Sequence, residues 1–181
     1  MADIIIETDR LILRTQAETD FDVWMREINS QRVKEYLGGI EEPHETEAAF
    51  ARAAASQAKE GFSFWFVALK ETGELIGACG LKRLDADTAP NEIKGNIEIG
   101  WIFGEKYWRK GYASEAANAS LDYAFARTDA ARVIALTSQS NIPSWKMMEK
   151  LGMQRREEFE FHDPDFPARD NPTIVYLKEK P

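Results

Sequence analysis

The sequence predicts a single domain of the α/β class, of α+β type, over residues 1–181. Three observations support this prediction. The chain has 181 residues, a length that suits one domain with a well-buried core. Apolar residues make up 44% of it and charged residues 30%, as in an ordinary soluble globular protein. Short strand patterns alternate with helical patterns, and no repeat, low-complexity tract or linker divides them.

The first half of the chain consists of short elements separated by turn residues. Gly38-Gly39 make the segment around them irregular, Gly61 is a natural stop after an alanine-rich helix, and Gly73 lies in a hairpin-length turn. The expected elements are a strand at 11–14, a helix at about 17–28, an irregular stretch at 29–44, a helix at 45–59 and strands at 62–69 and 74–82.

The second half alternates strands and helices. The acidic segment around Pro90-Asn91 is expected to be an exposed loop. Small and apolar residues at helical spacing in 113–127 predict a helix whose first turns approach a sheet closely. The expected elements are a loop at 85–94, a strand at 96–103, a helix at 113–127, a strand at 132–138, a short helix at 144–151, a strand at 153–161, a loop at 162–172 and a strand at 173–178.

Charge and composition exclude several classes of protein. A net charge of -8 argues against a nucleic-acid binder, which would carry a basic face. The longest apolar run, 64–69, is too short to span a bilayer, and the N-terminus lacks a signal-peptide pattern. One cysteine, Cys79, permits no internal disulfide, and the two histidines lack metal-ligand spacing. We therefore expect a cytoplasmic protein with no metal, no nucleic-acid partner and no membrane association.

The segment 107–114 is the most informative motif of the chain. It lies between an apolar strand pattern and an amphipathic helical run, with two cations before Gly111 and small residues after it. Free helix N–H groups and the positive end of the helix dipole make such a junction an anion site, typically for a pyrophosphate. A P-loop would need Lys and Ser/Thr directly after the glycine, where this chain has Tyr112 and Ala113. A dinucleotide fingerprint would need three spaced glycines.

Four segments in order resemble the GNAT superfamily of acetyl-coenzyme A-dependent N-acetyltransferases, especially the branch with the ribosomal-protein N-terminal acetyltransferases. They are 7–14 (ETDRLILR), 97–101 (IEIGW), 108–116 (WRKGYASEA) and 141–153 (NIPSWKMMEKLGM). The resemblance covers nearly the whole chain. It implies a mixed, mostly antiparallel, twisted sheet of about six to seven strands, with helices on both faces and splayed central strands.

The same resemblance implies how acetyl-coenzyme A binds. It assigns the pyrophosphate to Arg109, Lys110, Gly111, Tyr112, Ala113 and Ser114. It assigns the pantetheine and the thioester carbonyl to free backbone N–H groups at Trp101, Ile102 and Phe103. Asn141 is expected to contact the coenzyme and also suits the N-cap of the following helix.

Glu98 and Ser144 are the candidate catalytic residues. Glu98 is the candidate base for the acceptor amine, because flanking apolar residues predict partial burial and a raised pKa. The alternative is an ordinary charged residue at a strand edge. Ser144 is the candidate donor to the departing thiolate, and its alternative is a polar residue in the first helical turn. Tyr107 and Tyr112 are further possible acids, although such tyrosines more often serve packing.

Other residues have simpler interpretations. Cys79 is expected to be a buried core thiol rather than a nucleophile, which favours direct transfer without an acetyl-enzyme. His162 is expected to be a loop residue. The acids at Glu41, Glu42, Glu45 and Glu47 normally form a solvated face, although an acidic rim there would attract a cationic amine.

The resemblance therefore predicts transfer of an acetyl group from acetyl-coenzyme A to a primary amine, in particular a protein or peptide N-terminal amine. One alternative acceptor is a small-molecule amine such as an aminoglycoside, a polyamine or an amino acid. A second alternative is a non-catalytic acyl-coenzyme A-binding module. A monomer and a homodimer are both compatible with the sequence.

Overall fold

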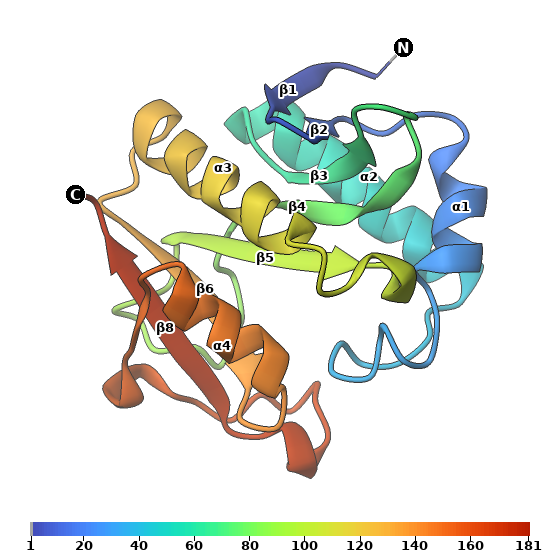
Figure 1. Ribbon diagram of the computed structural model, residues 1–181. Helices are drawn as coiled ribbons and strands as arrows, with labels where there is room; N and C mark the ends of the chain where they lie inside the picture. The colour runs from blue at the N-terminus through green and yellow to red at the C-terminus, as the bar shows by residue number, and fades with distance from the viewer. Residues whose placement is uncertain (1) are drawn as a thin grey trace.

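The computed structural model describes residues 2–181 and contains one mixed sheet with four α-helices (Figure 1). The strands are β1 (Ile4–Glu7), β2 (Leu11–Arg14), β3 (Phe64–Leu69), β4 (Leu75–Arg83), β5 (Ile97–Phe103), β6 (Arg132–Ser138), β7 (Gln154–Arg155) and β8 (Thr173–Glu179). The helices are α1 (Asp20–Glu27), α2 (Pro43–Glu60), α3 (Tyr112–Arg127) and α4 (Ile142–Lys150).

The eight strands lie in the order β1-β2-β3-β4-β5-β6-β8-β7. Only β5 and β6 run parallel, and every other neighbouring pair is antiparallel. The mixed, mostly antiparallel sheet is therefore confirmed. It has one strand more than the upper expectation, because β1 pairs with β2 at an edge where no strand was predicted.

The predicted strand at 153–161 is wrong over most of its length. Only Gln154 and Arg155 pair with β8, and a 3-10 turn follows at Glu157–Phe159 before Phe161 forms one isolated bridge with Thr173. The charged run between Arg155 and Glu160 explains the difference, because an edge with solvated charges has little apolar surface to bury in a sheet.

Two helices also begin earlier than predicted, each with a proline in its first turn. The capping box formed by Glu42 and Glu45 allows α2 to begin at Pro43. Pro143 occupies the first turn of α4, which begins at Ile142. Proline is tolerated there because the N–H it lacks would have no partner within the helix.

Helices cover both faces of the sheet, as expected. In Figure 1, α3 and α4 lie in front of the strands and α2 lies behind them. The front core includes Leu13, Trp65 and Ile99 from the strands and Ala117 and Leu121 from α3. Alanines on the inner face of α3 bring this helix close to β4 and β5.

The opposite face has two smaller cores. The first packs Trp24 of α1, Ile28 directly after α1 and Phe50 of α2 against Phe66. In the second, Leu84 and Ile93 of the segment between β4 and β5 pack against β6 and β8. The position of Glu98, on the same face of β5 as its register partner Ile134, is therefore next to this second core.

The central strands are splayed. β5 and β6 pair only at Ile97↔Val133 and Glu98↔Ile134, and they diverge beyond this point (Figure 1). β6 remains paired with β8 over its whole length, so the divergence separates the sheet into two parts that meet at two residue pairs. A gap between hydrogen-bonding edges is thereby created in the middle of the sheet.

Candidate active site

The loop between β5 and α3 forms an anion cradle. Arg109 has φ 60° and Gly111 has φ 82°, so the chain enters the left-handed region twice before α3 begins. No backbone N–H from Arg109 to Ser114 donates to an acceptor among residues 2–181. Six successive free N–H groups at a helix N-terminus form a concave donor surface that fits the oxygens of a pyrophosphate.

The turn between β1 and β2 supports this loop from behind. The Arg10 guanidinium lies 2.6 Å from the Glu115 carboxylate, donates to the Lys110 carbonyl at 3.0 Å, and lies 4.6 Å from the centre of the Tyr112 ring. Thr8 donates its hydroxyl hydrogen to Glu115 at 2.6 Å. No role for Arg10 or Glu115 was evident from the sequence, because these contacts join residues a hundred or more positions apart.

The gap edge of β5 presents alternate backbone groups. Gly104 N–H donates to the Ile76 carbonyl of β4, so even-numbered residues of β5 direct their backbone groups to β4. Trp101 and Phe103 therefore direct theirs into the gap, beyond the last pair with β6. The predicted site residue Ile102 is not brought to the gap, because its backbone faces its β4 partner Ala78.

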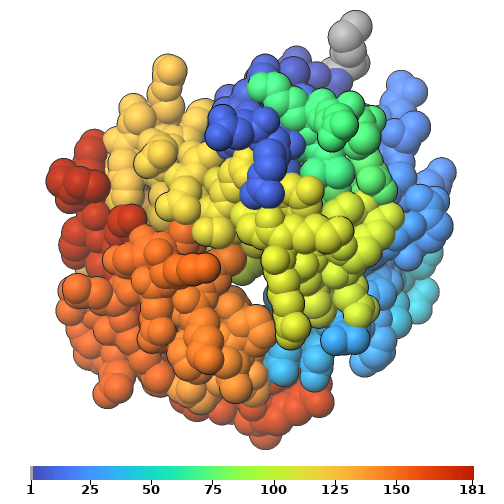
Figure 2. All heavy atoms as spheres, viewed as in Figure 1, coloured from blue at the N-terminus to red at the C-terminus, as the bar shows by residue number. Residues whose placement is uncertain are grey.

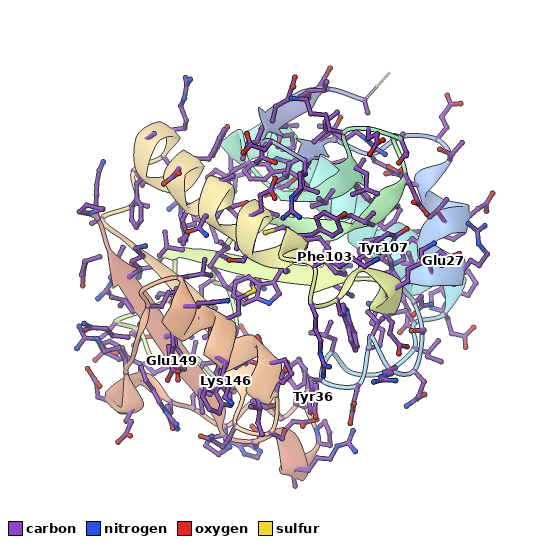
Figure 3. All side chains as sticks on the ribbon, viewed as in Figure 1. Glu27, Tyr36, Phe103, Tyr107, Lys146 and Glu149 are labelled. Atoms are coloured by element: carbon purple, nitrogen blue, oxygen red, sulfur yellow. The ribbon has the colours of Figure 1, made fainter. Side chains whose placement is uncertain are left out.

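Trp108 lies at the mouth of the gap. Its indole N–H donates to the Phe103 carbonyl at 2.7 Å, and 39% of the residue is exposed. Figure 2 shows a hollow between the segment that follows β5 and the segment around α4. In Figure 3, Phe103 and Tyr107 lie on the β5 side of this opening, Lys146 lies on α4, and Tyr36 lies near the lower edge.

Glu98 occupies the vertex where β5 and β6 part. Its side chain is 12% exposed, and the Lys82 ammonium nitrogen lies 3.3 Å from its Oε2 atom. That oxygen is buried without a hydrogen bond among residues 2–181. Burial raises the pKa of the Glu98 carboxyl above its ordinary value, and the charge of Lys82 offsets only part of this effect. A buried carboxyl group with a raised pKa, at the edge of a gap in the sheet, has the properties of a general base.

Asn141 and Ser144 lie at the start of α4. Asn141 occupies the N-cap position, but its side chain makes no capping hydrogen bond. The cap interpretation therefore has no hydrogen bond to support it. Ser144 lies in the first turn and is half-buried, and its backbone N–H donates to the Asn141 carbonyl at 3.1 Å. Neither side chain makes a hydrogen bond within residues 2–181, so both can bind a ligand.

The two candidate catalytic residues belong to opposite faces of the sheet. Ile97 and Ile99 point into the core beneath α3, so Glu98 between them points to the other face. Ser144 belongs to α4, which packs on the α3 side through Met148. The gap passes between them, which suits a reaction in which the amine and the thiol leaving group are on opposite sides of one carbonyl.

A buried acid near α4 was missed by the sequence analysis. Asp170 is 4% exposed and accepts a hydrogen bond at 2.9 Å from the Ser140 hydroxyl, which lies 2.9 Å from that of Ser138. This chain links the loop before β8 to the turn that starts α4. An aspartate flanked by Arg169 and Asn171 in a proline-rich loop carries no pattern that would predict its burial.

The simpler interpretations of Cys79 and His162 are confirmed, and Tyr107 belongs to the core. Cys79 is fully buried, and burial raises the pKa of its thiol to about 12, although a hydrogen bond with Ser120 opposes the shift. His162 is exposed in its loop. Tyr107 packs in the front core, and Tyr112 packs against its edge.

Three of the four acids near α2 have local structural roles. Glu41 binds the Lys34 ammonium at 2.6 Å and accepts from Thr46 at 2.9 Å. Glu42 and Glu45 form the capping box of α2. An acidic rim that attracts the acceptor amine is therefore reduced to Glu47 in this region.

The described part of the chain lacks both a metal-ligand cluster and a membrane-spanning helix. Among residues 2–181, no cluster of three or more His, Cys, Asp or Glu side chains is arranged to hold a metal ion. No helix in the same range has the length and apolar character needed to cross a membrane.

Known sequences are similar to this chain over most of its length. Residues 10–154 match the family described as the acetyltransferase (GNAT) domain. The "uncharacterized N-acetyltransferase" YnaD of Bacillus subtilis is 33% identical over 154 residues, which cover 85% of this chain and 84% of YnaD. The B. subtilis protein YkkB is 32% identical over 149 residues, which cover 81% of this chain and 83% of YkkB.

Solved structures share the fold over almost the whole chain. An acetyltransferase from Agrobacterium tumefaciens has a TM-score of 0.77 at 29% identity and covers 96% of this chain and 93% of its own. The ribosomal L7/L12 α-N-protein acetyltransferase RimL, in complex with coenzyme A, has a TM-score of 0.75 at 14% identity over 98% of both chains. Spermidine N-acetyltransferase from Vibrio cholerae has 0.70 at 18% identity, covering 96% of this chain and 97% of its own.

Proposed function

Because this chain belongs to the GNAT family of acetyl-coenzyme A-dependent N-acetyltransferases, we propose that it acetylates the N-terminal amine of a protein or peptide by direct attack on the thioester. The single observation that carries the donor half of this proposal is the row of six free N–H groups at Arg109–Ser114. This donor surface matches the pyrophosphate of coenzyme A.

The residues around the gap fit the remainder of the coenzyme. In this proposal, the Trp101 backbone and the Phe103 N–H bind the pantetheine as a neighbouring strand would, since within residues 2–181 this edge of β5 has no strand partner beyond Glu98. The Phe103 carbonyl already accepts the Trp108 indole N–H. Bound acetyl-coenzyme A supplies an activated acetyl group. A backbone N–H directed at its carbonyl oxygen stabilises the negative charge that develops there.

Glu98 acts as the base in this mechanism. The α-amino group of a polypeptide has an ordinary pKa of about 8 and is largely protonated at neutral pH, so an acceptor for its proton is required. The Glu98 carboxylate takes this proton directly or through a water. Its burial at the vertex of the gap and its raised pKa support the assignment.

Ser144 donates a hydrogen bond to the departing thiolate, and Asn141 contacts the coenzyme beside it. Their free side chains at the start of α4 support both roles. Cys79 takes no part, because it is fully buried and is the only cysteine of the chain. Direct transfer follows, since no other thiol is present to form a thioester with the acetyl group.

The choice of acceptor rests on one comparison. RimL, named as an α-N-protein acetyltransferase, shares the fold over 98% of both chains. Spermidine and aminoglycoside acetyltransferases also share the fold, so a small-molecule amine is the second candidate.

One experiment separates these functions. The protein is incubated with acetyl-coenzyme A and either a lysine-free peptide, spermidine or an aminoglycoside, and products are identified by mass spectrometry. We expect acetylation of the peptide and none of the same peptide with a blocked N-terminus. Acetylation of only the small amines would overturn the acceptor assignment. Coenzyme binding without any product would instead identify a non-catalytic acyl-coenzyme A-binding module.

A further inference from the structure

We propose that Arg10 and Glu115 are a positioning pair that sets both the shape and the charge of the pyrophosphate cradle. The pair lies outside the loop itself, and neither residue is among those the proposed mechanism uses. The inference rests on the proposed coenzyme-dependent function, and it adds a determinant of coenzyme affinity located in the β1–β2 turn.

The Arg10 guanidinium fixes the direction of one peptide group in the loop. Arg10 Nη1 donates to the Lys110 carbonyl at 3.0 Å, while the other nitrogens of the guanidinium bind Glu115 at 2.6 and 2.7 Å. A peptide unit is planar, so its carbonyl and the next N–H point in opposite directions. By binding the Lys110 carbonyl, Arg10 turns the Gly111 N–H to the other side, toward the concave surface of free N–H groups.

The backbone of Arg109 in this loop is strained. Arg109 adopts φ 60°, which an L-residue other than glycine, asparagine or aspartate rarely adopts. Such a backbone persists only where neighbouring contacts enforce it. The hydrogen bond to Lys110, one residue further on, is a contact that opposes relaxation of the loop, and stacking of the guanidinium over Tyr112 at 4.6 Å holds the donor in place.

Arg10 also compensates the negative charge of the Glu115 carboxylate. Glu115 lies in the first turns of α3, where its carboxylate would repel a bound pyrophosphate. Burial raises the pKa of this carboxyl, but hydrogen bonds from Thr8 and Arg10 outweigh burial and keep it ionised. Arg10 neutralises that charge in place. Glu115 in turn holds Arg10 beside the loop, so each member positions the other.

These contacts predict that Arg10→Ala and Glu115→Gln lose different amounts of coenzyme A affinity. Arg10→Ala leaves an uncompensated carboxylate beside the cradle and releases the Lys110 carbonyl. Glu115→Gln keeps a side chain of the same shape and removes the repelling charge, but it also weakens the bonds that hold Arg10 beside the loop, and this second effect is expected to be the larger. We expect the dissociation constant for coenzyme A to rise about tenfold or more in Arg10→Ala and about threefold in Glu115→Gln, and the double variant to recover part of the Arg10→Ala loss.

The test compares coenzyme A with pantetheine, which has the same thiol end and no pyrophosphate. Dissociation constants are measured by calorimetry for the wild type, the three variants and Arg10→Lys. Arg83→Ala is the matched control, because Arg83 also binds a carboxylate, a carbonyl and an aromatic ring, through Asp129, Gly95 and Phe62. Urea unfolding of each variant reports folding separately from binding.

The expected result is a loss of coenzyme A affinity confined to the Arg10 and Glu115 variants, with pantetheine affinity unchanged and partial recovery in Arg10→Lys. Equal losses for both ligands, or the same loss in Arg83→Ala, would show a general structural effect and overturn the inference. Unchanged coenzyme A binding in Arg10→Ala would also overturn it. A wild type that binds no coenzyme A would instead contradict the proposed function.

Discussion

The Glu98 carboxylate combines burial with incomplete compensation of its charge. Its side chain is 12% exposed, one oxygen lacks a hydrogen bond, and its cationic neighbour Lys82 is itself 41% exposed. Ionisation of Glu98 is therefore opposed by the fold that holds it. This cost is consistent with a residue kept for its chemistry, and it leads to two separate predictions.

Glu98→Gln is expected to lower kcat at neutral pH by about a hundredfold or more, because the proton acceptor is lost. Wild-type activity should fall as the pH drops through the raised pKa of Glu98, and the variant should lack this acidic limb. Steady-state rates measured from acidic to mildly basic pH test this, with the dissociation constant for coenzyme A as the control. An acidic limb that persists in the variant would contradict the role of Glu98 as base.

The same substitution is expected to stabilise the folded state at neutral pH. The folded pKa of Glu98 lies above its unfolded value, so the folded state binds the proton more tightly. Stability is therefore lost as the pH rises through this interval, and the loss persists above it. In Glu98→Gln the uncharged amide does not ionise, so this loss of folded-state stability is absent. Urea midpoints of the wild type and Glu98→Gln, measured at neutral and at acidic pH, should differ more at neutral pH; a less stable variant there would refute this.

The variant Asn141→Ala tests whether the Asn141 side chain caps α4 or contacts the coenzyme. A capping side chain contributes about 1 kcal/mol to stability, but Asn141 makes no capping hydrogen bond. We expect its free energy of unfolding to change by less than about 0.5 kcal/mol while the KM for acetyl-coenzyme A rises severalfold. A large loss of stability in urea unfolding, with an unchanged KM, would restore the cap interpretation.

Single residues were predictable where local pattern decides their environment. The apolar neighbours of Cys79 predicted its burial, and the flanking isoleucines of Glu98 predicted partial burial. Arg10, Glu115 and Asp170 carry no such local signal. Their contacts depend on turns and loops that are brought together only by the order of strands in the sheet.

At the scale of elements, β5 has one paired edge and one edge that is open past Glu98. Ile102 faces β4, whereas Trp101 and Phe103 face the gap. The sequence analysis placed all three residues in one binding group, because a strand pattern does not reveal which edge carries a partner. The strand predicted at 153–161 failed for a different reason: its apolar spacing was given more weight than the charged run between Arg155 and Glu160, over which the chain leaves the edge of β8.

Hydrogen exchange tests the two edges of β5 directly. The amides of Trp101 and Phe103 are expected to exchange faster than that of Ile102, since only the latter is directed to a strand partner. Coenzyme A should slow exchange at Trp101 and Phe103 and leave Ile102 little changed. Residue-resolved exchange by NMR measures all three, and equal protection of the three amides by the coenzyme would contradict the proposed pantetheine contact.

Gly111→Val tests the junction of loop and helix. Gly111 has φ 82°, and a Cβ atom there would lie 3.2 Å from Arg10 Nη2. Valine therefore strains the backbone and also displaces the guanidinium. We expect coenzyme A binding to be lost in calorimetry while pantetheine still binds. Gly95→Val is the control, since Gly95 has φ 75° with no atom near its would-be Cβ; equal losses in both variants would point to strain alone.

For the whole molecule, a net charge of -8 contrasts with exposed cations near the cradle and on α4. These are Arg109, Lys110, Lys146 and Lys150. Attraction between exposed charges weakens when added salt shortens the screening length, which is about 10 Å at 0.1 M. The KM for acetyl-coenzyme A should therefore rise severalfold between low and high salt, whereas that for S-acetylpantetheine should not. Equal salt dependence for the two donors would contradict this.

The fold class and most elements followed from the sequence, since periodicity and turn residues act locally. The splay of the central strands came with the resemblance and not from the pattern of apolar residues, because the two neighbouring residue pairs that join β5 and β6 leave no distinct signal in either strand. The order and direction of the strands create the gap between β5 and β6. This gap determines which of the predicted site residues lie close together.

The buried thiol of Cys79 has a practical consequence for anyone who handles this protein. With that sulfur enclosed beneath α3 and its pKa near 12, thiol-directed reagents have no accessible target on the native chain. A cysteine introduced at the rim of the gap would be the sole labelling position, ready for a fluorophore or a spin probe without prior removal of a native residue. Disulfide trapping of coenzyme analogues at a chosen rim position becomes possible on the same background.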